Sequence, residues 1–173
     1  MGIIFYEEHF LVLPKRLNLG KSYTIWFRMY NPVMKTGNFH VLLQDPSGLG
    51  GIIVIDNTCR RMGAFTKDGD FIDSGVDLSQ AKYNNKWLQF AMSYSQLSEN
   101  TKLHFYLNGE EERTYDKQKI ILPSTLQYIG NCRDYNEPFG IVCDLRIYRK
   151  FHEKKQIEKL FGIKKITEDL IIR

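Results

Sequence analysis

Alternation of apolar and polar residues is the dominant pattern along the chain. Short segments in which every second residue is apolar recur between residues 10 and 148, each bounded by Gly, Pro, Asn or Asp. This pattern is typical of strands that bury one face in an antiparallel sheet. In the segment 23–30, Ile25, Phe27 and Met29 share one face, which we expect to be core. The chain therefore predicts an all-β fold.

Turn residues divide the expected strands. Segments 87–94 and 102–107 form the clearest predicted hairpin. Two further turns are expected, because Asp, Asn and Gly accept the backbone angles that tight turns require; they are Lys67-Asp68-Gly69-Asp70 and Asn108-Gly109.

The last two expected strands, 126–132 and 139–148, each contain a cysteine. If these strands pair across the turn between them, Cys143 lies opposite Tyr128 and not opposite Cys132. A disulfide between the two cysteines would then need a different register. We expect all three cysteines of the chain to be free thiols.

The periodicity changes after residue 150. Phe151, Ile157, Leu160 and Phe161 recur at helical spacing, and Gly162 is a suitable C-terminal stop. We therefore expect one short helix at the end of a single sandwich domain spanning residues 1–162. Residues 163–173 are expected to form a C-terminal extension that docks on the body or leads into an adjoining segment.

Composition and charge exclude several classes of protein. The net charge of the 173-residue chain is only +4, and its basic residues are scattered among acidic ones, so nothing implies a nucleic-acid partner. No apolar run is long enough to span a membrane, and the chain start does not resemble a secretory signal. No Asn-X-Ser/Thr glycosylation site is present. We expect an intracellular protein, or a module of a larger one.

The order of several short motifs resembles the concanavalin A-like lectin/glucanase superfamily, and its laminin G-like modules in particular. The motifs are Leu17 to Ile25, Asn85-Lys86-Trp87, Tyr106-Leu107-Asn108-Gly109, and Pro138 to Tyr148 followed by a helix with Gln156 to Leu160. Two positions differ from the family pattern, which often has histidine where Leu88 stands and tryptophan where Arg28 stands.

The resemblance implies a two-sheet antiparallel jelly-roll sandwich in which one curved sheet offers a concave face. Members of the superfamily bind carbohydrates, proteins or lipids, sometimes through calcium, and a minority hydrolyse glycans. The fold alone therefore leaves the function open.

A catalytic site is not expected. The hydrolytic branch of the superfamily carries its carboxylates on one strand as Glu-x-Asp-x-x-Glu, and this pattern is absent. The only glutamate cluster, Glu110 to Glu112, follows a turn and is typical of a solvated, charged edge strand. No Gly-x-Ser-x-Gly elbow is present.

A binding face is predicted by the other side of segment 23–30. Trp26, Arg28 and Tyr30 lie there, and because burying an arginine is costly we expect this face to point outward. An exposed aromatic stripe with planar polar groups suits a sugar ring, but it is equally typical of protein interfaces. Four more residues could extend the stripe and complete the predicted ligand-binding set; they are His104, Tyr106, Arg146 and Tyr148.

The sequence thus favours a non-catalytic, lectin-like recognition module that binds a glycan or a protein through the concave sheet face. The alternative is a structural interaction domain of a larger intracellular protein, with that face covered by residues 163–173 or by a partner chain.

No cofactor is required by the sequence, and calcium is the only candidate. Hard oxygen ligands in loops would suit it, and Asp45, Asp70 and Asp73 are the predicted metal residues. Asp45 follows a strand, and laminin G-like modules can place a metal-binding aspartate at a sheet rim. The spacing does not match an EF-hand, and aspartate in turns commonly serves backbone hydrogen bonds instead.

Overall fold

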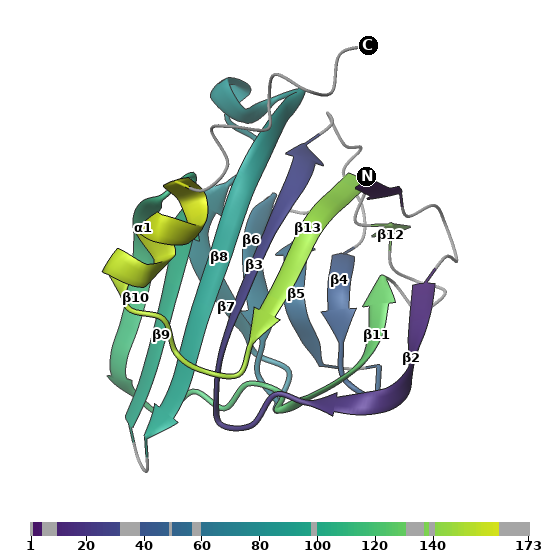
Figure 1. Cartoon of the computed structure of the whole chain (residues 1–173), viewed down its shortest axis with the longest axis vertical. Helices are drawn as coiled ribbons and strands as arrows, with labels where there is room; N and C mark the ends of the chain where they lie inside the picture. Colours follow the sequence, from purple (N-terminus) through teal and green to yellow (C-terminus); the bar gives the residue numbers. More distant parts are fainter. Residues whose placement is uncertain are drawn as a thin grey trace.

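Two sheets packed face to face form the protein (Figure 1). The computed structural model describes residues 2–4, 10–31, 39–48, 50–56, 60–97, 100–130, 137–138 and 141–162. Within these residues the fold is an all-β sandwich with one short α-helix, as predicted.

Sheet A has six antiparallel strands. In spatial order they are β1 (Gly2–Ile4), β13 (Ile141–Tyr148), β3 (Ser22–Asn31), β8 (Lys86–Leu97), β9 (Asn100–Leu107) and β10 (Glu110–Gln118). Strand β10 is the charged edge strand that the sequence predicted.

Sheet B has seven strands, six of which follow one path. In spatial order these are β2 (Phe10–Asn18), β11 (Thr125–Gly130), β4 (His40–Gln44), β5 (Gly51–Asp56), β6 (Arg61–Phe65) and β7 (Phe71–Asp77). The short strand β12 (Glu137–Pro138) lies parallel to β4, and a 3₁₀ turn, Ala81–Tyr83, precedes β8.

The main core lies between the sheets and confirms the predicted buried face of β3. Ile25, Phe27 and Met29 are each 0% exposed. Phe27 packs on Phe90 of β8 with ring centroids 5.5 Å apart, and residues from both sheets complete the same cluster. The alternation of side chains along β3 thus assigns its inner face correctly.

Two buried tyrosines tie the core to the segment that links β10 with β11. Tyr23 Oη donates to Pro123 O (3.1 Å), and Tyr94 Oη donates to Ile120 O (3.1 Å). Burial raises the pKa of the Tyr23 phenol well above its usual value. Both hydroxyls therefore act as hydrogen-bond donors that fasten this linker across the end of the sandwich.

The two predicted tight turns are confirmed. Gly69 has φ +93° between β6 and β7, and Thr66 N donates to Asp70 O (2.9 Å). Asn108 (φ 52°) and Gly109 (φ 92°) join β9 to β10. The predicted hairpin of β8 and β9 is also present, with Met92 opposite Phe105.

The last two strands do not form the hairpin considered from the sequence. Strand β11 belongs to sheet B, where Tyr128 lies opposite Val12 and Gln44. Strand β13 belongs to sheet A, where Cys143 lies opposite Gly2 and Arg28. The chain crosses between the layers here, and alternation alone does not reveal such a crossing because strands of both sheets have the same period. Cys143 is a free thiol, and Cys132 lies outside the described residues.

The single described α-helix, α1 (Lys154–Gly162), confirms the predicted helix and lies against the outer face of sheet A, in front of β9 and β10 in Figure 1. No helix among the described residues has the length and apolar character required to cross a bilayer.

Candidate functional site

The seven predicted ligand-binding residues share the outer face of sheet A. Strand register places Trp26 opposite Arg146 on one side and Ala91 on the other, and Ala91 opposite Tyr106. The remaining members follow at two-residue steps along the same strands and are Arg28, Tyr30, His104 and Tyr148. Three strands thus bring together residues that are more than 100 positions apart in the sequence.

Helix α1 covers one part of this face and leaves another part open. The Phe161 ring meets the Trp26 indole edge to face at a centroid distance of 6.4 Å, and Trp26 is only 1% exposed. Ile157, which is 0% exposed, Tyr106 and Ala91 complete a small second core between the helix and the sheet. The prediction that Trp26 forms an open platform is therefore wrong, because the apolar side of α1 packs on it. Helix α1 is the described element that covers Trp26. Residues 163–173 lie outside the described residues.

His104 and Tyr106 are engaged within the protein. His104 Nδ1 lies 2.9 Å from Glu111 Oε1, and its Nε2 lies 3.2 Å from Asp116 Oδ1. The Tyr106 hydroxyl lies 3.3 Å from His104 Nδ1. Burial, and then the nearby Glu111 carboxylate, raise the pKa of the Tyr106 phenol, which stays neutral.

The segment that leads from β13 to α1 is fastened to the start of β3. Phe151 N donates to Ser22 Oγ (3.0 Å), and His152 N donates to Thr24 Oγ1 (3.0 Å). The Phe151 ring also meets His104 edge to face at 5.3 Å. These contacts hold α1 over the part of the face that contains Trp26.

His152 is buried in this connection. Its ring stands edge to face on Tyr148 at 4.7 Å, and its Nδ1 has no hydrogen-bond partner within the described part of the chain. Burial, with a smaller effect of Lys150, lowers the pKa of His152. Tyr148, a predicted ligand residue, thus packs on the connecting segment.

We expect acidification to destabilise the protein through His152. A histidine whose pKa is lower in the folded state stays neutral there while the unfolded chain binds a proton. The contribution of His152 to stability is therefore complete above the pKa of about 6.5 in the unfolded chain. It is lost as the pH falls toward the lower pKa in the folded state. Urea unfolding of the wild type and of His152→Asn, measured at neutral pH and at about pH 5, should show a smaller pH-dependent loss in the variant. Equal losses would contradict this assignment.

Beyond the helix, four residues form a patch that we call the aromatic ledge: Arg28, Tyr30, Trp87 and Asp144. Trp87 is 43% exposed, and the Tyr30 ring meets it edge to face at 5.7 Å. The Arg28 guanidinium carbon lies 5.5 Å from the Trp87 ring centroid, and its Nη1 lies 3.8 Å from Asp144 Oδ2. The arginine is mostly buried, as 11% of its side chain is exposed, but its charge is paired with Asp144.

Trp87 was not among the residues that sequence reasoning assigned to the binding face. The missing information was the pairing of β3 with β8, which sets Trp87 opposite Tyr30. Gln89, two residues further along β8 and opposite Arg28, has a buried side-chain oxygen without a hydrogen-bond partner in the described part of the chain. An aromatic ring, a paired cation and a spare acceptor therefore lie on one stretch of the sheet.

Arg146 takes a different position from the ledge. Its guanidinium carbon lies 5.2 Å from the Trp26 ring centroid, on the β13 side of that buried indole. Arg146 therefore borders the helix-covered part of the face.

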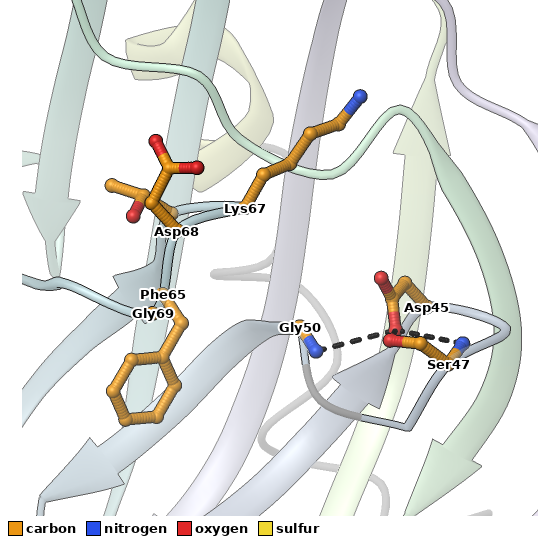
Figure 2. Close-up of a pocket in the computed structure, with 8 residues that line it drawn as sticks. Asp45, Ser47, Gly50, Phe65, Lys67, Asp68 and Gly69 are labelled. Atoms are coloured by element: carbon orange, nitrogen blue, oxygen red, sulfur yellow. Dashed lines mark hydrogen bonds between the residues drawn. The ribbon is translucent and has the colours of Figure 1, made fainter.

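A pocket of about 510 Å³ lies at the rim of sheet B, between the β4–β5 turn and the β6–β7 turn. Figure 2 shows Asp45 and Ser47 on one side and Lys67 and Asp68 on the other. Asp45 Oδ1 accepts hydrogen bonds from Ser47 N (3.1 Å), Ser47 Oγ (2.6 Å) and Gly50 N (3.2 Å). The Asp45 carboxylate thus stabilises the turn in which it lies.

The Asp73 carboxylate is also engaged within the protein. Asp73 Oδ1 accepts from Gly75 N (2.7 Å), and its Oδ2 lies 3.2 Å from Arg113 Nη1. The backbone N–H of Asp70 donates to Thr66 Oγ1 (3.0 Å). Among the described residues, no three His, Cys, Asp or Glu side chains come together as a metal-binding group, so Asp45, Asp70 and Asp73 do not form one.

No known family matches the sequence, and no curated protein matches it. Solved structures do resemble the fold. The receptor-binding domain of botulinum neurotoxin type G is 14% identical with a TM-score of 0.58, over 94% of this chain and 46% of that one. A heptameric SAP-like pentraxin from Limulus polyphemus is 13% identical with a TM-score of 0.60, over 92% and 81%. Trypanosoma rangeli sialidase is 13% identical with a TM-score of 0.58, over 84% and 23%.

The chain thus spans less than half the length of the toxin domain that it resembles. These proteins share a lectin-like sandwich or jelly-roll architecture, which supports the predicted fold. At such low identity they show the fold alone.

Proposed function

We propose that this protein is a non-catalytic recognition module that binds a glycan on the aromatic ledge. The observation that carries the proposal is the open indole of Trp87, which is 43% exposed, is supported by Tyr30 and lies beside the Arg28 guanidinium. Similar structures include a toxin receptor-binding domain and a pentraxin, and this supports a binding role for the fold.

The ledge suits a sugar ring chemically. The apolar face of a pyranose stacks on an exposed indole, while its hydroxyls need donors and acceptors at the ring edge. Arg28 and Asp144 supply both kinds of group, and their mutual contact at 3.8 Å orients them before a ligand arrives. Preorganised groups lose little conformational entropy on binding, which favours affinity.

A second candidate function is a structural interaction domain of a larger intracellular protein. The observation that favours it is the coverage of the Trp26 part of the face by α1, which removes Trp26 and Tyr106 from any ligand. On this alternative a protein partner, and not a glycan, occupies the remaining ledge, since exposed Trp, Tyr and Arg are also enriched at protein interfaces.

Replacing Trp87 with alanine tests the glycan proposal. We expect the wild type to bind at least one class of glycan on an array, and Trp87→Ala to lose at least tenfold in affinity in a titration with that glycan, because the stacking surface is gone. Leu97→Ala is the matched control: Leu97 is 54% exposed at the other end of β8 and should bind normally when truncated.

Equal affinity of Trp87→Ala and the wild type would refute the ledge as the binding site. No glycan signal for the wild type would refute the glycan proposal and favour the interaction domain.

A further inference from the structure

The N-terminal half of β2 presents apolar side chains to solvent at the margin of sheet B. Phe10, Leu11 and Val12 are 39%, 48% and 57% exposed. They are consecutive, so both faces of the strand carry exposed apolar surface. Leu11 lies opposite Ile129, which packs against the main core, and yet half of Leu11 remains uncovered. Exposed apolar runs of this kind indicate an interaction surface.

The backbone of β2 is also open on one side. Strand β2 is the terminal strand of sheet B, paired with β11 and with no other described strand, and it lies at one margin of the molecule in Figure 1. Gln127 Nε2 of β11 donates to Leu13 O (2.7 Å), so the Leu13 carbonyl faces β11. The backbone groups of successive strand residues point to alternate sides of the strand. The backbone groups of Phe10, Val12 and Pro14 therefore face the open margin.

We propose that β2 pairs antiparallel with β2 of a second copy of this chain, about a two-fold axis at Val12. In this register Val12 lies opposite Val12 of the other copy, and Leu11 lies opposite Leu13. Phe10 lies opposite Pro14, whose carbonyl can accept the Phe10 N–H although proline has no N–H to return. Every exposed apolar residue of the segment then meets an apolar residue, which is the self-complementarity that a two-fold interface requires.

The charge pattern of the sequence fits the same register. Lys15 and Arg16 follow the apolar segment and are exposed. An axis at Val12 sets these cations of the two copies at opposite ends of the paired segment. A parallel pairing would instead set like charges together, which is unfavourable. The charges therefore favour the antiparallel direction for a second copy.

Sedimentation velocity of the full chain over a range of concentrations tests the proposal. We expect reversible dimers, and we expect Val12→Lys to weaken the dimer at least tenfold, because it sets two lysines against each other at the axis. Leu97→Lys is the matched control, since Leu97 is an equally exposed apolar residue, at 54%, that lies on sheet A. Wild-type protein that stays monomeric throughout, or equal weakening by both variants, would overturn the proposal.

A cysteine variant tests the register. Paired residues that exchange backbone hydrogen bonds have Cα atoms about 5.5 Å apart, a separation that a disulfide can bridge. Val12→Cys should therefore form a disulfide-linked dimer under mild oxidation, whereas Leu97→Cys and the wild type, treated in parallel, should not. A dimeric wild type whose Val12→Cys variant fails to cross-link would show that the axis is not at Val12.

Discussion

Trp26→Ala is expected to destabilise the protein by about 3–5 kcal/mol, the range for removing a large buried aromatic side chain. Trp26 joins α1 to sheet A through Phe161, and the small core around it has few other members. Truncation of the indole leaves a cavity between the helix and sheet A. Urea unfolding should therefore show a lower free energy of unfolding.

Trp87→Ala is the control for this prediction, because it removes the same side chain from the same face of sheet A. Trp87 is 43% exposed, and its truncation should cost much less. Limited trypsin digestion adds a local measurement: cleavage at Lys154 or Lys155 in α1 should be faster in Trp26→Ala than in Trp87→Ala. Similar stability losses in the two variants would show that α1 does not depend on Trp26.

Gly63→Ala is expected to cost at least about 3 kcal/mol, the upper part of the range for overpacking a core. Gly63 lies in β6, between Val54 of β5 and Asp73 of β7. A Cβ atom on Gly63 would approach the Ile72 backbone oxygen and the Phe71 ring far more closely than atoms pack. Because the nearest obstacle is backbone, β7 itself would have to move away from β6.

Gly162→Ala provides the matched control for Gly63→Ala. A Cβ atom on Gly162 would meet nothing within 4 Å, and the residue lies in α1, where alanine is preferred to glycine. Thermal unfolding should therefore show an unchanged or slightly raised midpoint for Gly162→Ala and a clear decrease for Gly63→Ala. An unchanged midpoint in Gly63→Ala would mean that β6 and β7 are free to separate at this point.

The sequence predicted those parts of the fold that depend on local patterns. The buried side of β3, the two tight turns, the hairpin of β8 and β9 and the single helix all follow from residue spacing and from backbone preferences. The assignment of strands to sheets did not follow, because β11 and β13 have the same alternation whether they pair with each other or lie in opposite layers. Only the long-range pairings, such as Val142 with Met29, settle this question.

The candidate site was predicted in part. The pattern placed Trp26, Arg28 and Tyr30 on one face, which the structure also shows. It did not reveal that α1 covers Trp26 and leaves Tyr30 beside the open ring of Trp87, because the docking of a helix on a sheet depends on residues that are distant in sequence. That these residues bind a ligand stays a prediction.

The unequal burial of the only two tryptophans makes each of them an independent optical reporter. Trp26 is shielded from water, so its emission should lie toward the blue and respond when the helix above it leaves the sheet. Trp87 is open to solvent, so its emission should lie toward the red and respond to quenchers or to a sugar stacked on it. Fluorescence of the unlabelled protein can therefore follow the covered and the open parts of one face separately.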